Sequence, residues 1–200
     1  MDRRLEGWPL LGVISIALLA MTLVCLVFAG FDSDGARLVI RATARTSVVL
    51  FGGAYIASSL VQLWRHPSSK WLLRNRRYVG VGFGVSHGIH YAAVVAFLLL
   101  EPEIFDAENG PLGYEKLYPI IMLALLVATS FDRAVKVLGR RAWKAIHVVG
   151  VHSYWVLFLV AFGKLSAGSI FYSSFTVFIV GLMVVRLAPM GQRVWKRRAA

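Results

Sequence analysis

The chain has 200 residues, of which 58% are hydrophobic and 16% charged, and its mean hydropathy is +0.68. The apolar residues form long blocks, which excludes an ordinary soluble domain. The net charge of +12 does not indicate a nucleic-acid partner, because the basic residues cluster at the ends of the apolar blocks. Cys25 is the only cysteine, so no internal disulfide and no cysteine-ligated metal site is expected. The composition predicts a protein embedded in the lipid bilayer.

Six apolar segments, each near the ~20 residues that a helix needs to cross hydrocarbon, predict a single all-α domain of six transmembrane helices over residues 1–200. In the fourth segment the continuous apolar part ends at Phe131, and the charged residues that follow predict a helix continuing into the inner headgroups. The loop 101–117 contains Asn109-Gly-Pro and predicts an outer connection with a turn. The segments cover residues 8–31, 46–64, 78–100, 118–138, 145–162 and 169–187.

The basic residues are distributed unevenly between the two sides of this bundle. Seventeen of the 22 lysines and arginines lie on one side: before the first segment, between the second and third, from Arg133 to Lys144 around the end of the fourth, or from Arg186 onward. Seven of the ten acids lie in the opposite loops. Because positive charge is enriched on the cytoplasmic side, we expect a multi-pass protein of the plasma membrane (the inner membrane of a bacterial cell) with both termini in the cytoplasm.

Four of the five histidines lie inside the apolar segments: His87 and His90 in the third, His147 and His152 in the fifth. An ionisable side chain at membrane depth costs roughly a few kcal/mol unless it has a partner, so its presence indicates a function. Histidines on neighbouring helices can bind opposite faces of a haem iron. These four residues are therefore the candidate metal ligands, whereas His66, in a basic loop, is expected to be solvated or among headgroups.

Helical geometry narrows the choice of ligands. His87 and His90 lie on one face, whereas His147 and His152 lie about 140° apart and do not both face the same neighbour. With the arginines before each helix as inner-surface markers and a rise of about 1.5 Å per residue, the depths are ~15 Å for His87, ~20 Å for His90, ~9 Å for His147 and ~17 Å for His152. Depth therefore favours His152 together with His87 or His90.

Two further stripes accompany the histidines. Gly80, Gly84 and Gly88 recur every four residues and allow close approach, of another helix more often than of a flat cofactor. Three arginines spaced by four precede the second segment and form a basic stripe, Arg37, Arg41 and Arg45. Arg41 and Arg45 are candidates for pairing with haem propionates or an anionic substrate, and snorkelling to phospholipid is the alternative.

Several of these motifs resemble the ferric-reductase-like transmembrane domain family, which includes the haem-binding membrane subunit of the periplasmic methionine sulfoxide reductase system. The resemblance implies a six-helix b-type cytochrome that passes electrons across the membrane. It also implies that His90 is the third-helix ligand and His147 the first fifth-helix ligand. The motifs, within residues 41–162, are Arg41-Ala-Thr-Ala-Arg45, Arg76-Arg77, Ser86-His-Gly-Ile-His90, Thr129-Ser-Phe-Asp132 and Leu138-Gly-Arg-Arg-Ala-Trp-Lys-Ala-Ile-His147.

The chain departs from the family pattern. The second fifth-helix histidine of that pattern would fall near Val160 or Ala161, and no histidine stands there, so one haem b is expected rather than two. No flavin or nicotinamide site is recognisable, so we expect a separate electron donor, a quinol or a flavoprotein, and an external acceptor of unknown identity. The alternatives are a non-catalytic assembly subunit and a proton or metal transporter, and the latter is disfavoured because the spans lack acids.

Overall fold

The structure, a computed structural model, describes residues 5–110, 113 and 116–198 and is helical throughout this part of the chain. Five helices, α1, α2, α3, α6 and α7, are long and apolar enough to cross a membrane, which indicates a multi-pass helical membrane protein. The prediction of an all-α membrane fold is confirmed at this level. The helices are α1 (Trp8–Ala29), α2 (Ser33–Leu63), α3 (Pro67–Leu100), α4 (Pro102–Asn109), α5 (Leu117–Ala128), α6 (Asp132–Ser166) and α7 (Ile170–Arg198).

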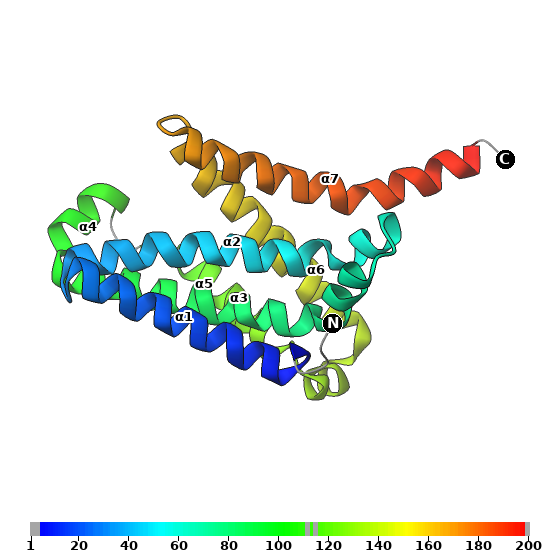
Figure 1. The fold of residues 1–200 in the computed structure, drawn as a ribbon, viewed down its shortest axis with the longest axis horizontal. Coiled ribbons are helices and arrows are strands. Elements are labelled where there is room, and N and C mark those ends of the chain that lie inside the picture. The colour runs from blue at the N-terminus through cyan, green and yellow to red at the C-terminus, as the bar shows by residue number, and fades with distance from the viewer. Residues whose placement is uncertain (1–4, 111–112, 114–115, 199–200) are drawn as a thin grey trace.

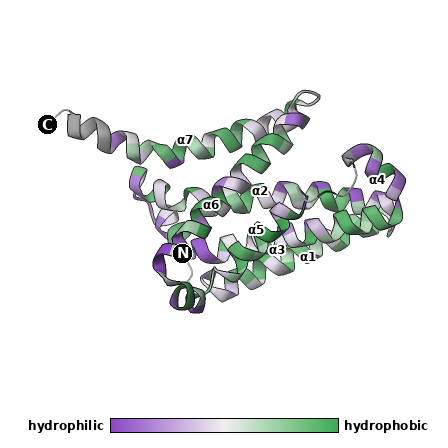
Figure 2. Ribbon diagram, turned by 180° about the vertical axis from the view of Figure 1, so that it is seen from behind, coloured by the Kyte–Doolittle hydropathy of each residue, from purple (hydrophilic) through white to green (hydrophobic). Residues whose placement is uncertain are grey.

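Helix α2 lies at the centre of the bundle and packs against α1, α3 and α7 (Figure 1). Helix α6 crosses the bundle obliquely and contacts α5 and α7, while α5 lies against α3 and α6. The main core cluster combines side chains of α2, α3, α5, α6 and α7, among them the fully buried Val48 and Tyr154. The ribbons of the long helices are largely coloured as hydrophobic (Figure 2), and many of their large apolar side chains are exposed, as expected for a surface that faces lipid.

Local sequence signals set the helix boundaries. Gly30 ends α1 with a φ of 101°, which favours glycine. The Asp32 carboxylate then accepts hydrogen bonds from the backbone N–H groups of Asp34 and Gly35 and caps α2. His66 and Ser69 form a reciprocal capping box at the start of α3, where Pro67 occupies the first turn. His66 stacks on Trp64 at an exposed position, in agreement with its predicted solvated place.

The predicted continuous helix over 118–138 is wrong. Helix α5 ends at Ala128, because the hydroxyls of Thr129 and Ser130 donate to the end carbonyls of the helix, those of Leu125 and Leu126. The chain turns at 129–131, and α6 begins at Asp132 and contains a further break at Gly139, which has a φ of 75°. The 12 residues of α5 rise about 18 Å, less than the ~30 Å of a hydrocarbon core.

Other boundaries also move. The loop predicted over 101–117 contains the short helix α4, and Gly110 follows it with a φ of 71°. Pro111, part of the turn expected there, lies outside the described residues. Helices α2, α3 and α6 begin well before the segments predicted over 46–64, 78–100 and 145–162, because their polar first turns are helical as well. Hydrophobicity locates the buried part of such helices but not their polar ends.

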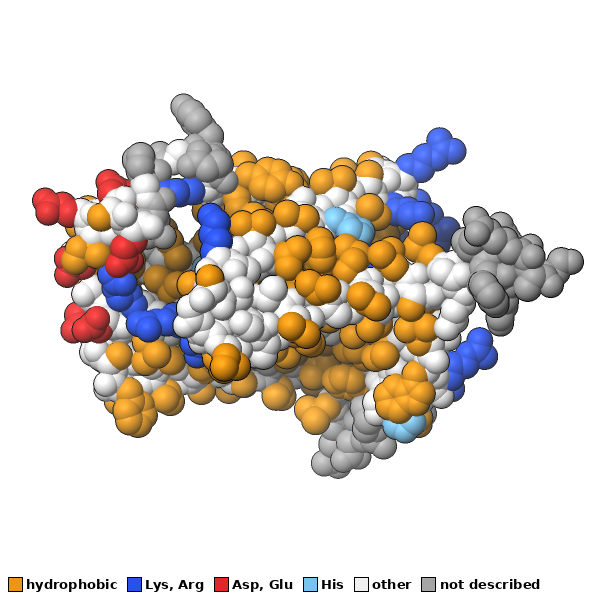
Figure 3. All heavy atoms as spheres, turned by 90° about the horizontal axis from the view of Figure 1, so that it is seen from above, with side chains coloured by type: hydrophobic (Ala, Val, Ile, Leu, Met, Phe, Trp, Pro, Cys, Tyr) orange, Lys and Arg blue, Asp and Glu red, His pale blue; other side chains and the backbone are white. Residues whose placement is uncertain are grey.

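On the face seen in Figure 3, acidic side chains gather at one end, beside some basic ones, whereas basic side chains alone lie at the other end. Ion pairs join helices at both ends: Arg37 to Glu108 at one, and Arg77 to Asp132 at the other. By their positions along the helices, Asp32, Asp34, Glu101, Glu103, Asp106 and Glu108 lie at the acidic end, as do Arg37, Arg41, Arg45 and Lys116, and the basic end carries Arg65, Lys70, Arg74, Arg76, Arg77, Arg133, Lys136, Arg140, Arg141 and Lys144. The start of α1 and the last turns of α7 both lie at the basic end (Figure 1).

Candidate functional site

The third-helix histidines form one stacked pair. The rings of His87 and His90 lie 4.9 Å apart between centroids with an interplanar angle of 7°. Edge-on rings of Tyr91, Tyr154 and Phe158 enclose His87, which is 7% exposed. Its Nδ1 atom is buried without a hydrogen-bond partner among the described residues. This pair lies in the apolar core, and α6 contributes aromatic side chains, not histidines, to its surroundings.

A backbone contact fixes the tautomer of His90. Its Nδ1 lies 3.1 Å from the carbonyl oxygen of Ile40 on α2, an atom that only accepts hydrogen bonds. The hydroxyl of Thr43 lies 3.4 Å away and donates its own hydrogen to Val39. The Nδ1 atom therefore carries the proton, which leaves a lone pair on Nε2. A histidine anchored in this way links α2 to α3 and keeps one nitrogen available as a ligand.

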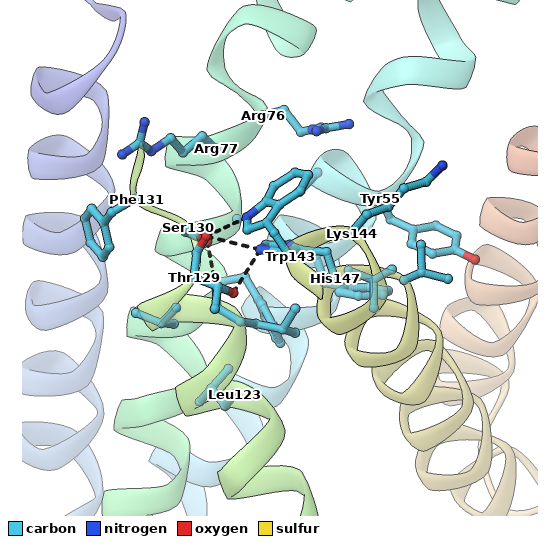
Figure 4. A pocket seen from close by; sticks show the side chains of 18 of the residues that line it. Tyr55, Arg76, Arg77, Leu123, Thr129, Ser130, Phe131, Trp143, Lys144 and His147 are labelled. Carbon is cyan, nitrogen blue, oxygen red and sulfur yellow. Dashed lines mark hydrogen bonds between the residues drawn. The ribbon is translucent and has the colours of Figure 1, made fainter. Parts of the chain in front are cut away.

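His147 is held at the turn between α5 and α6 (Figure 4). Its Nε2 lies 3.0 Å from the hydroxyl oxygen of Thr129, and that hydroxyl donates to the carbonyl of Leu125 at 2.6 Å. The Nε2 atom is therefore the donor in the contact with Thr129. The indole of Trp143 packs on the imidazole at 4.5 Å and donates to the carbonyl of Thr129 at 2.8 Å. Two side chains of α6 thus anchor the turn through one threonine.

His152 lies on a different face of α6. Its Nδ1 donates to the carbonyl of Val148 one turn earlier at 2.7 Å, and its ring meets the edge of Tyr55 on α2 at 5.7 Å. The pairing with His87 or His90 that depth favoured is not among the ring contacts of the described residues, in which Tyr154 and Phe158 meet His87 instead. Rotation about the helix axis places His152 toward α2 rather than toward the third-helix pair.

A cavity of about 490 Å³ opens at the basic end between α2, α3, α5, α6 and α7, and we call it the basic-end cavity. Its apolar walls include Phe51, Phe83 and Leu123, and His147 lines it beside Trp143 (Figure 4). Four cations also line it, namely Arg76, Arg77, Lys144 and Arg186. Asp132 is the lining acid, and it pairs with Arg77 at 2.9 Å. The remaining three cations make the cavity suitable for an anionic group with a large apolar body.

The predicted site residues separate into four places. His147 lines the basic-end cavity, and His87, His90 and His152 do not. Arg41 and Arg45 lie near the start of α2, at the acidic end, and are also absent from the lining. Arg45 donates to the hydroxyl of Tyr172 on α7 at 3.2 Å and packs over Phe171, so it links α2 to α7. Arg41 donates to the carbonyl of Arg37 at 3.3 Å.

Of the three glycines in the predicted stripe, Gly84 alone allows the close approach of another helix. A Cβ atom on Gly84 would lie 2.4 Å from a methyl group of Val127, so this glycine admits α5 against α3. A Cβ atom on Gly88 would meet nothing within 4 Å. Of the three glycines, Gly80 is the one that lines the basic-end cavity. A Cβ atom on Gly80 would make one ordinary contact, with Ala54 at 3.8 Å.

Sequence reasoning assigned no role to three residues of the cavity. Thr129 and Arg76 belong to the motifs on which the family resemblance rests, and nothing else in the sequence pointed to a role for them. No sequence pattern pointed to a role for Arg186, because a single arginine near the cytoplasmic end of a membrane helix is common. In the structure Arg186 packs over the ring of Tyr55 at 4.4 Å and donates to its carbonyl, so its charge is directed into the bundle.

Comparisons with models of protein families, with curated proteins and with solved structures found no match. Among the described residues no group of three or more histidine, cysteine or acidic side chains is arranged to hold a metal ion. The fold defines the class, a multi-pass helical membrane protein, and the chemistry of the cavity is the basis for a function.

Proposed function

We propose that this chain is a b-type haem protein of the plasma membrane that transfers electrons to an external acceptor, with the basic-end cavity as its haem site. The observation that supports this function is the combination, in one cavity, of a histidine, apolar aromatic walls and three cations that have no acidic partner among the described residues. Haem b has the complementary parts, an iron that takes imidazole, a flat apolar ring and two carboxylates. The family resemblance points to the same ligand, His147.

The volume and the chemical character of the cavity suit haem. About 490 Å³ lies within the range of cofactor pockets, roughly 300–1,000 Å³. Phe51, Phe83 and Leu123 supply apolar surface, and Gly80 keeps the α3 wall thin. Arg76, Lys144 and Arg186 supply positive charge for propionates. Arg76 and Lys144 are exposed and Arg186 is partly buried, so an anionic ligand can pair with them at the opening of the cavity.

The residues of the cavity have different roles in haem binding. His147 binds the iron with one imidazole nitrogen, and Trp143 restricts the rotation of that ring by packing on it. The cations hold the carboxylates, and the apolar walls exclude water. Haem supplies one-electron redox chemistry, and the environment of the iron tunes its potential. The site lies at the basic end, the cytoplasmic end by the charge rule, where a quinol or a separate flavoprotein is the proposed donor.

Absorption spectroscopy of the purified protein tests this function. We expect a Soret band that sharpens and shifts on reduction with dithionite, in protein expressed with adequate haem supply. The apoprotein incubated with haem should recover the same spectrum at about one haem per chain. A preparation with intact helical structure and no Soret band, before and after incubation, would contradict the proposal.

The threonine at the turn offers a second test. Thr129→Val keeps the side-chain shape but removes the hydroxyl oxygen that accepts from His147 Nε2 and thereby orients the imidazole with Nδ1 free for the iron. A net hydrogen bond is worth about 1 kcal/mol, and we expect roughly fivefold weaker haem binding in a titration of the apoprotein. Ser130→Ala, which alters the same turn without touching His147, should leave the Kd unchanged. Unchanged or tighter binding by Thr129→Val would show that this bond does not position the ligand.

We further propose six crossings, the fourth made by α5 with the turn at 129–131. Phe105, beside Phe97 near the end of α3, lies under the ammonium of Lys116 just before α5. Asp132, just after the turn, pairs with Arg77 near the start of α3. Arg77 and Phe97 lie 20 residues apart on α3, about 30 Å along its axis, so the chain from Lys116 to Asp132 connects two levels separated by roughly the thickness of the hydrocarbon core.

This topology predicts the sides of the connections. A cysteine placed at Ser68, at the basic end, should resist a membrane-impermeant maleimide in intact cells, whereas one at Asp106, on α4, should react. Both should react after the membrane is permeabilised, and Cys25 is replaced by serine beforehand to remove background labelling. Equal reactivity at the two positions in intact cells would exclude the arrangement.

A second candidate function is a non-catalytic membrane subunit whose histidines only join helices. The contacts of His90 with Ile40 and of His147 with Thr129 favour it, because each satisfies an imidazole nitrogen across two elements. This candidate predicts no haem binding and a loss of thermal stability when either histidine is replaced. The same absorption spectrum therefore separates the two functions.

A further inference from the structure

The basic-end cavity contains a single histidine. In the described part of the chain, His147 is the one imidazole among the lining residues. The hydroxyl of Tyr55, another lining residue and a conceivable iron ligand, donates to the sulfur of Met183 on α7 at 3.5 Å and is directed out of the cavity. The other lining side chains are apolar, cationic or hydroxylic, apart from Asp132, which Arg77 holds.

The remaining histidines are not among the lining residues of this cavity. His152 lies against the edge of Tyr55, and its Nδ1 donates to the carbonyl of Val148. On α3, His87 lies four residues beyond Phe83, the last lining residue of that helix, about 6 Å along the axis, and His90 lies about 10 Å beyond it. Both rings lie against aromatic neighbours, and the nearest of these on α6, Tyr154, is fully buried. Close packing of this kind leaves no second site of haem size between α3 and α6 at the level of the pair.

From this we infer that His147 is the one side chain among the described residues that would bind the iron of a haem in the basic-end cavity, and that the iron would keep a position open to a small exogenous ligand of the carbon monoxide or cyanide class. The inference rests on the proposed function and departs from the two-histidine ligation that the sequence predicted. An open position changes the chemistry available, because a haem with two tightly bound histidines transfers electrons whereas one with a free position also binds diatomic molecules.

Carbon monoxide binding to the dithionite-reduced holoprotein tests the inference. We expect a high-spin ferric spectrum and, on addition of carbon monoxide to the reduced form, conversion of most of the Soret band to a carbonyl form. His87→Ala, His90→Ala and His152→Ala should behave as the wild type. A low-spin spectrum without a carbon monoxide response would overturn the inference but leave the haem function standing. Absence of haem would overturn both.

A gain-of-ligand variant sharpens the test. Gly80→His introduces an imidazole on the α3 wall, where a side chain meets only Ala54 at the Cβ position. We expect a low-spin spectrum and at least about tenfold weaker carbon monoxide binding. Gly88→His places the same residue two turns away at an exposed position outside the cavity and is the matched control. If Gly80→His fails to fold, the wild-type carbon monoxide result and the three alanine variants decide. A folded, haem-loaded Gly80→His protein with an unchanged spectrum would argue against a free position facing α3.

Discussion

Replacing His147 with alanine is expected to remove most of the haem from the purified protein, lowering haem occupancy by at least about tenfold. Among the four intramembrane histidines it is the one that lines the basic-end cavity, and without it only apolar contacts and the propionate contacts of three cations remain. Haem per chain is measured by the pyridine haemochrome spectrum against protein concentration. Circular dichroism in the same detergent verifies that the variant keeps its helices.

His152→Ala is the matched control for this experiment. It removes the same type of side chain from the same helix, five residues away, outside the cavity lining. We expect it to keep wild-type haem content. The opposite pattern, with haem retained by His147→Ala and lost from His152→Ala or His90→Ala, would move the haem to the middle of the bundle and restore the pairing that depth alone favoured.

Gly35→Ala is expected to give the largest loss of stability among single-methyl additions. A Cβ atom on Gly35 would lie 1.8 Å from the carbonyl oxygen of Gly30, a backbone atom fixed by the tight connection between α1 and α2. Relief of such a clash requires a shift of the first turn of α2, which Asp32 caps, and we expect a cost of about 1–3 kcal/mol. Thermal unfolding in detergent, followed by circular dichroism, measures the change in Tm.

Gly12→Ala provides the comparison, because a Cβ atom there meets nothing within 4 Å and alanine favours a helix. Its Tm should equal or exceed that of the wild type. If both variants unfold at the wild-type temperature, the connection between α1 and α2 accommodates the added methyl group, which contradicts the prediction.

The sequence predicted the class of fold because hydrophobic length is a local property. Twenty apolar residues in a row indicate a membrane-crossing helix whatever their neighbours, so α1, α2, α3, α6 and α7 were all anticipated. The helix predicted over the fourth segment was wrong for a local reason that hydrophobic composition does not reveal. The hydroxyls of Thr129 and Ser130 end α5, although both residues are compatible with a helix interior by propensity alone.

The sequence also marked the histidines as exceptional, since an ionisable group at membrane depth requires a partner. It did not determine which of them face a common space. Spacing gives the angle between His147 and His152 on one helix, but the direction in which either points depends on how α6 is rotated against α2 and α5. In the structure the helix break at 129–131 places Thr129 beside His147, and His152 lies against Tyr55.

By itself, then, the sequence determined the membrane class, the long helices, the charge asymmetry of the two ends and the four candidate ligands. The tertiary structure decided which ligand meets a cavity and which cations surround it. Arg186 on α7 and Arg76 on α3 lie far apart in the chain and line one cavity only because both helices pack on α2. Such convergence depends on packing between distant segments, and no local pattern of residues encodes it.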